Sequence, residues 1–171
     1  MSNKEDRGVG GQTSNGTPLK STNDKLRLLI TDDSRLLRKK LREELEKLGC
    51  EVIEASNGKE AIMRDLEQEP DGVILDIVMP EVGGIEALQV IREVSPTVPI
   101  VMLSSAGTPQ KLMQTLKMGA IDFIQKPYTK EQIARAVAAI RKAREKNLKK
   151  AAKATQVSET GEGVSFNHEE P

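Results

Sequence analysis

Short apolar runs alternate with segments of helical periodicity between Lys25 and Lys146, and this alternation most restricts the fold. Strands that alternate with helices are typical of parallel pairing through right-handed crossovers. Runs that are continuously apolar favour a sheet covered on both faces. The pattern therefore predicts an α/β fold, a three-layer α/β/α sandwich around a five-stranded parallel sheet. The predicted strands are residues 26–30, 51–55, 73–75, 99–103 and 121–125.

The junctions between these segments carry helix-starting and helix-ending residues. A polar cap followed by Glu, Gln or Pro is typical of a helix start, and a glycine after the last apolar position is typical of a helix end. Predicted starts are Asn57 with Glu60, Thr108 with Pro109, and Thr129 with Gln132, and predicted ends are Gly49 and Gly119.

The regions outside this domain are polar. Residues 1–24 are mostly Gly, Ser, Thr, Asn and charged residues, so we expect a disordered tail. Residues 147–171 are expected to form a helical extension and then a disordered tail that begins at Thr155. Residues 141–153 hold seven basic residues and one acid, which indicates a solvated helix or a site for an acidic partner or nucleic acid. Residues 147–171 lack hydrophobic periodicity, so we expect no DNA-binding domain in this segment.

Composition excludes several classes of function. The chain has 26 basic and 26 acidic residues, so a polybasic coat over the whole molecule is ruled out. No apolar run approaches the length of a membrane span. A single cysteine, Cys50, cannot form an intrachain disulfide and is consistent with the cytoplasm. A single histidine, His168, lies in a polar tail and supplies no base for a Ser-His-Asp mechanism.

Polar residues follow four of the predicted strands. Ligands of an open parallel sheet bind at the carboxyl ends of its strands, so these residues should meet at one edge. Taken one at a time, each has an ordinary structural explanation as a helix cap, turn residue or surface charge. Together they have no shared structural reason to occupy the same edge. They are Asp32 and Asp33, Asp76, Ser104, and Lys126.

Their chemistry favours phosphoryl transfer. Three carboxylates close together repel one another and need a cation, and oxygen ligands without His or Cys suit Mg²⁺. A carboxylate that attacks phosphorus forms an acyl phosphate. Mg²⁺ and Lys126 would neutralise the phosphoryl oxygens, and the Ser104 hydroxyl could donate a hydrogen bond to one of them.

These motifs closely resemble the receiver domain of bacterial two-component response regulators, of the stand-alone chemotaxis-regulator type. The resemblance covers residues 25–146 and implies the flavodoxin-like strand order 2-1-3-4-5. Four motifs in different parts of the domain carry it. They are Asp32-Asp33, residues 75–80 (LDIVMP), residues 102–106 (MLSSA) and residues 126–129 (KPYT).

The resemblance implies a role for each site residue. Asp76 would be the phosphoacceptor, and Ser104, Lys126 and Phe123 would bind the phosphoryl group or switch with it. The Lys126–Pro127 peptide bond would be cis. Apolar residues at Val78 and Ala106 would leave no side chain to orient water, so we expect a long-lived phosphoryl group. The implied Mg²⁺ ligands are Asp33, Asp76 and the backbone carbonyl of Val78, with Asp32 acting through water.

The resemblance also implies a signalling function without conventional enzyme turnover. A partner histidine kinase would donate the phosphoryl group, and a surface formed by the fourth helix, fifth strand and fifth helix would then bind an effector. A phosphorelay intermediate that passes the group to a histidine phosphotransfer protein is the alternative. Arg35, Arg38, Lys39 and Arg42 would form either a solvated face paired with Glu43 and Glu46 or a kinase-docking face.

Two other classes share parts of this pattern. A phosphatase of the haloacid dehalogenase type also uses Asp, Mg²⁺, a hydroxyl and a lysine. Its nucleophile lies in an Asp-x-Asp element after the first strand, where this chain has Asp32-Asp33-Ser34. A flavodoxin-like cofactor binder would need aromatic residues for the flavin and an anion-accepting loop after the first strand. This chain has an acidic pair after that strand, which would repel a phosphate without a metal. A degenerate receiver acting as a scaffold is disfavoured because every chemical position is filled.

Overall fold

The computed structural model describes residues 25–105 and 109–160, with side chains through residue 154. Five strands alternate with five helices, as the sequence pattern predicted. In chain order these elements are β1 (Arg27–Thr31), α1 (Arg35–Lys47), β2 (Glu51–Ala55), α2 (Gly58–Gln68), β3 (Gly72–Asp76), α3 (Gly84–Val94), β4 (Ile100–Ser104), α4 (Pro109–Lys117), β5 (Asp122–Gln125) and α5 (Lys130–Thr160).

The strands form one parallel sheet in the order β2-β1-β3-β4-β5. The predicted fold class and strand order are therefore confirmed. β1 and β3 lie side by side, and their register pairs Thr31 with Leu75. From β1 the chain first goes to β2 on one side of it and then to β3 on the other side. The loops after β1 and β3 therefore lie on opposite sides of a crevice at the carboxyl edge of the sheet.

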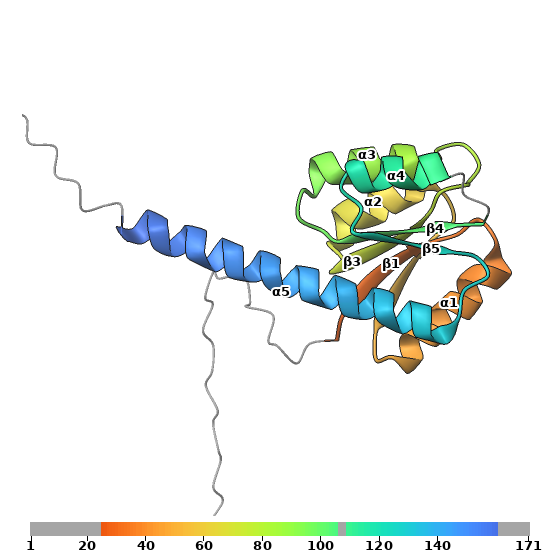
Figure 1. Cartoon of the computed structure of the whole chain (residues 1–171), viewed down its shortest axis with the longest axis horizontal. Helices are drawn as coiled ribbons and strands as arrows, with labels where there is room; N and C mark the ends of the chain where they lie inside the picture. Colours follow the sequence, from red (N-terminus) through yellow and green to blue (C-terminus); the bar gives the residue numbers. More distant parts are fainter. Residues whose placement is uncertain (1–24, 106–108, 161–171) are drawn as a thin grey trace, which may run out of the picture.

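Helices cover both faces of the sheet, with α2, α3 and α4 on one face and α1 and α5 on the other (Figure 1). Two separate apolar clusters fill the layers. Leu75, Met102 and Leu88 belong to the cluster under α2–α4, and Ile74 and Ile140 belong to the one under α1 and α5. Alternate residues of each central strand thus point into different clusters, which accounts for the continuously apolar strands.

The predicted helix signals act as expected where the structure describes them. Asn57 accepts a hydrogen bond from the Glu60 amide at 2.8 Å. Thr129 and Gln132 bond reciprocally, side chain to backbone, at the start of α5. Gly49 and Gly119 follow α1 and α4 with φ of 80° and 104°, a region that glycine adopts without strain. Thr108, the predicted cap of α4, lies outside the described residues.

α5 extends well past Ile140, its last residue in the apolar core. It runs to Thr160, whereas the composition predicted disorder from Thr155 onward; the alanine- and lysine-rich turns before Thr155 favour continued helix. Arg144 contacts Asp71 at 3.1 Å, and the Asn147 side chain donates to the Thr97 carbonyl at 2.7 Å. These contacts hold the extension against the amino-terminal edge of the sheet. No helix in the described part of the chain is long and apolar enough to span a membrane.

Gly84 allows α3 to begin directly against the end of β3. Its amide donates to the Ile77 carbonyl at 2.9 Å, and a Cβ placed on it would lie 1.9 Å from the Asp76 carbonyl oxygen. A side chain here therefore cannot fit unless the backbone that carries Asp76 moves. A Cβ on the neighbouring Gly83 would meet only the Ile77 oxygen, at 3.7 Å.

We expect Gly84→Ala to lower the free energy of unfolding by about 2 kcal/mol or more, because the clash is with backbone and cannot be relieved by a rotamer change. Urea unfolding followed by circular dichroism would measure this loss. Gly83→Ala is the matched control and should cost less than about 1 kcal/mol, the value of an altered N-cap. Equal losses in the two variants would contradict the close approach described here.

Candidate functional site

Three carboxylates gather at the carboxyl edge of the sheet. Asp32 follows β1, and Asp76 is the last residue of the neighbouring β3. Asp33 lies next to Asp32 and is exposed to solvent. Carboxylate oxygens of the three residues lie within 4.8 Å of one another. The structure therefore brings the three predicted acidic residues together.

Lys126 joins two of these carboxylates. It follows β5, and its Nζ donates to Oδ2 of Asp32 and to Oδ2 of Asp76, each at 2.7 Å. Its backbone amide donates to the Ser104 carbonyl at 2.6 Å, which ties the loop after β5 to the end of β4. The Lys126–Pro127 peptide bond is cis. One ammonium thus contacts the residue that follows β1 and the last residue of β3.

The site is a buried charge cluster with one open side. Asp32 is 2% exposed and Asp76 is 3% exposed. Burial raises the pKa of Asp76, and the hydrogen bond and charge of Lys126 oppose that rise. Burial lowers the pKa of Lys126, but its contacts with Asp32 and Asp76 outweigh this effect, so that its pKa is raised overall. The ammonium therefore stays charged over the physiological range.

The donor set fits a hard divalent cation. Three ionised carboxylates against one ammonium leave two negative charges. That excess equals the charge of Mg²⁺, which in proteins takes oxygen ligands and keeps several waters. The exposed Asp33 gives the cluster a side that is open to water. The residues present thus fit Mg²⁺ in both charge and ligand type.

Backbone amides fix the orientation of the two buried carboxylates. Asp32 Oδ1 accepts from the Ser34 amide at 2.9 Å, and Ser34 in turn caps α1. Asp76 Oδ1 accepts from the Val78 amide at 3.2 Å. The Val78 side chain is 61% exposed and takes no part in this contact. Each carboxylate is therefore held by its own following loop before any ligand binds.

The two predicted switch residues differ in their distance from this cluster. Ser104 ends β4 and is buried, next in sequence to Leu103, which pairs with Asp76 across the sheet. Phe123 lies on β5, is partly buried, and packs against the apolar cluster under α2–α4. The ring of Phe123 therefore lies on the face of the sheet that α2, α3 and α4 cover, outside the carboxylate cluster. Ala106 lies outside the described residues.

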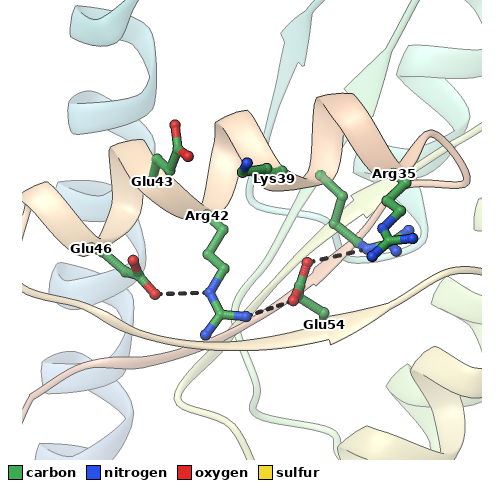
Figure 2. A pocket seen from close by; sticks show the side chains of 7 residues that line it. Arg35, Lys39, Arg42, Glu43, Glu46 and Glu54 are labelled. Carbon is green, nitrogen blue, oxygen red and sulfur yellow. Dashed lines mark hydrogen bonds and ion pairs between the residues drawn. The ribbon is translucent and has the colours of Figure 1, made fainter.

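A basic face of α1 borders the acidic site. Arg38 donates to the Asp32 carbonyl at 2.7 Å and pairs with Glu54 of β2 at 3.2 Å. Arg42 bridges Glu46, the expected partner on its own helix, and Glu54, at 2.8 and 2.7 Å (Figure 2). Together with the exposed Arg35 and Lys39 these side chains line a shallow pocket.

Sequence reasoning missed Glu54 and the contact between Arg38 and Asp32. The available signal was an acidic residue within a strand that otherwise alternates, next to a helix with six basic residues. Arg38 is only 16% exposed, and it anchors the backbone from which Asp32 and Asp33 project. We regard it as a positioning residue for the acidic site.

We expect Arg38→Met to weaken Mg²⁺ binding about tenfold, because the loop that carries Asp32 and Asp33 loses its charged anchor. Titration with Mg²⁺, followed by calorimetry or by amide chemical shifts of the loop, would measure the change. Arg42→Met removes two contacts of the same network without touching that loop, so its Mg²⁺ affinity should stay at the wild-type level. Unchanged affinity in Arg38→Met would contradict a positioning role.

Comparison with known proteins agrees with this site. A family model described as the response regulator receiver domain matches residues 28–138. The chemotaxis protein CheY of Thermotoga maritima is 38% identical over 112 residues, which are 65% of this chain and 93% of that protein. The chain is also 45% identical over 105 residues to a protein-glutamate methylesterase/protein-glutamine glutaminase of Archaeoglobus fulgidus. That match covers 60% of this chain and only 30% of the relative.

A solved structure of another protein has a similar fold. The CheX–CheY–BeF3–Mg complex from Borrelia burgdorferi contains a chain that is 31% identical, with a TM-score of 0.65. The match covers 67% of this chain and 88% of that chain. The family model accounts for more than half of the chain and includes each of the acidic residues, Ser104 and Lys126. The chain therefore belongs to the response regulator receiver domain family.

Proposed function

We propose that the domain accepts a phosphoryl group on Asp76 from a phosphohistidine of a partner kinase, with Mg²⁺ at the acidic site. The observation that carries the proposal is the Lys126 ammonium placed between the buried carboxylates of Asp32 and Asp76. A fixed positive charge beside a buried carboxylate, with an open acidic side, is suited to receiving an anion.

In the proposed step, a carboxylate oxygen of Asp76 attacks the phosphorus of the phosphohistidine. The new P–O bond makes an acyl phosphate as the P–N bond to imidazole breaks, and the leaving imidazole nitrogen takes up a proton from solvent. Attack requires the ionised carboxylate. Burial disfavours that form in Asp76, and the neighbouring Lys126 favours it.

Lys126 would follow the incoming charge. Its ammonium already reaches Asp76, so it is placed to bind a phosphoryl oxygen on that residue. Asp33, Asp76 and the carbonyl of Val78 would hold Mg²⁺, with Asp32 contributing through water. The ion would supply neutralisation of the phosphoryl oxygens during transfer.

The new phosphoryl group would be sensed by Ser104 and Phe123. A hydrogen bond from Ser104 to a phosphoryl oxygen would draw the loop after β4 toward Asp76, and Phe123 would turn inward as that loop moves. Such a change acts as a population shift, limited by the contacts that differ between the two states. The surface of α4, β5 and α5 would then bind an effector.

Chemotaxis signalling is the pathway that the relatives favour. The matched CheY protein is covered over 93% of its length, and the Borrelia burgdorferi structure holds a CheY chain with CheX. We infer that this domain acts by binding a partner protein after phosphorylation, as a phosphoacceptor rather than as an enzyme with a separate substrate. Transfer onward to a histidine phosphotransfer protein would instead place it in a phosphorelay.

Incubation with phosphoramidate and Mg²⁺, followed by intact-mass measurement, tests the proposal. We expect a gain of one phosphoryl group that is prevented by a chelator and lost on mild alkaline treatment, as an acyl phosphate requires. No gain under these conditions, or a gain that does not depend on the divalent cation, would overturn it. Turnover of small phosphate esters at a steady rate would favour a phosphatase instead.

A further inference from the structure

The outer face of α5 carries a row of positive charges that the proposed phosphoryl transfer to Asp76 does not use. Five basic residues contribute to it. At about 3.6 residues per turn they fall within an arc of about 60°. All five side chains are exposed, and in the described part of the chain none of them forms a salt bridge. We call this row the basic stripe: Arg135, Lys142, Lys146, Lys149 and Lys153.

The rotation of α5 about its axis is fixed by contacts on its opposite side. Ile133 and Ile140 are fully buried under the sheet, and Arg144 and Asn147 bond to the amino-terminal edge of the domain. These residues lie on the side of the helix away from the basic stripe. The side chains of the stripe are therefore exposed to solvent. The stripe continues along the part of α5 that projects beyond the sheet, a projection that Figure 1 shows.

We propose that the basic stripe binds the phosphate backbone of double-helical nucleic acid. From Arg135 to Lys153 the stripe spans about 27 Å, at 1.5 Å per residue. That length corresponds to about 8 base pairs of duplex at 3.4 Å per pair. Lysines along one helix face can contact successive phosphates without any base-specific side chain. Residues 141–153 hold seven basic residues and one acid in a chain with no net charge, and four of the seven belong to the stripe, so positive charge is concentrated in this part of α5.

The composition of the stripe disfavours the other polyanions. Protein interfaces are depleted in lysine at their centre and usually bury an apolar or aromatic anchor, and the stripe offers none. A helix that lies in a membrane surface needs an apolar face free to enter the lipid. The apolar face of α5 is packed against the sheet as far as Ile140. After Ile140, the same side of the helix carries Arg144 and Asn147, which bond to the domain. Single strands would need aromatic side chains for stacking, which the stripe also lacks.

The salt dependence of binding tests the proposal most sharply. We expect the full chain to bind a mixed-sequence duplex of about 20 base pairs with a log–log slope against salt of about −4, since each phosphate contact contributes about −0.9. Duplex DNA and duplex RNA serve as separate probes, measured by fluorescence anisotropy. Binding that does not depend on sequence supports backbone recognition.

The variant that tests the stripe replaces four of its lysines with glutamine, which keeps the helix propensity: Lys142, Lys146, Lys149 and Lys153. We expect a weaker slope by about three units and an affinity reduced at least tenfold at low salt. The matched control removes the same number of charges elsewhere by substituting glutamine for the exposed residues Lys25, Lys40, Lys59 and Lys117. It should bind nearly as the wild type does.

Three results would overturn the proposal. One is equal loss of affinity in the stripe variant and its control, which would show that only net charge matters. Another is binding to polyglutamate or to anionic vesicles as tight as binding to either duplex. The third is the absence of measurable duplex binding at low salt. Phosphorylation with phosphoramidate should be unchanged in the stripe variant, which separates this proposal from the function assigned to Asp76.

Discussion

Asp76→Asn is expected to take up no phosphoryl group from phosphoramidate and Mg²⁺, while the wild type gains one. The amide oxygen is a poor nucleophile toward phosphorus, and an acyl phosphate cannot form on it. Val78 and Lys126 donate to different oxygens of Asp76, so the single carbonyl oxygen of asparagine can keep one of these two hydrogen bonds. A circular dichroism spectrum that matches the wild type would show that the variant is folded. Loss of phosphorylation would thus report chemistry rather than unfolding.

The matched control for this experiment is Asp65→Asn. Asp65 of α2 is 1% exposed, and burial raises its pKa, as in Asp76. It accepts a hydrogen bond from the Ser95 hydroxyl at 2.6 Å, which an asparagine carbonyl can also accept. It lies near the opposite end of the sheet, so this variant should be phosphorylated as the wild type is. Continued phosphorylation of Asp76→Asn would place the acceptor elsewhere.

Lys126→Met is expected to lower the free energy of unfolding by about 3–5 kcal/mol when no divalent cation is present. Among the described residues, Lys126 is the only one whose positive charge contacts the carboxylates of Asp32 and Asp76. The Lys126 side chain is only 12% exposed. Its removal leaves two buried carboxylates facing each other without compensation. Urea unfolding in the presence of a chelator would measure the loss.

Addition of Mg²⁺ should recover part of that stability, because an ion that binds only the folded state shifts the equilibrium toward it. The recovery should be larger in Lys126→Met than in the wild type, since the cluster then carries a greater excess of negative charge. Lys130→Met is the control: this lysine is exposed, and its loss should cost less than about 0.5 kcal/mol. Equal stability of the two variants would contradict the electrostatic description of the site.

Most of the fold could be predicted from periodicity. Continuous apolar strands and helix caps such as Asn57 and Thr129 indicated the layers and the junctions. β1 and β4 each lie one residue later than predicted, because pairing with neighbouring strands sets the ends of a strand and a single run does not show it. The strand order came from the resemblance to receiver domains, since periodicity alone does not say which strands are neighbours.

The site was predictable to the level of which residues meet. The rule that ligands bind at the carboxyl ends of parallel strands was enough to collect Asp32, Asp76 and Lys126 at one edge. It gave no distances, and it did not show that one ammonium would bridge both carboxylates. That contact depends on the path of the loop after β5, which includes the cis bond before Pro127.

Contacts between side chains of distant elements could not be predicted. Arg38 had expected partners on its own helix, yet it pairs with Glu54 of β2 and with the Asp32 carbonyl. Helical spacing shows only neighbours on the same helix, and the tilt of α1 over β2 decides the rest. The basic stripe of α5 is similar, because its direction depends on contacts such as that between Arg144 and Asp71.

The most direct test of the central claim is to locate the phosphoryl group on the chain. Reduction of the phosphorylated protein with borohydride converts an aspartyl phosphate to homoserine, and peptide mass spectrometry then identifies its position. We predict homoserine at residue 76 alone, formed only after incubation with phosphodonor and Mg²⁺. Homoserine at Asp32 or Asp33, or a phosphoryl group found on Ser104, would contradict the account.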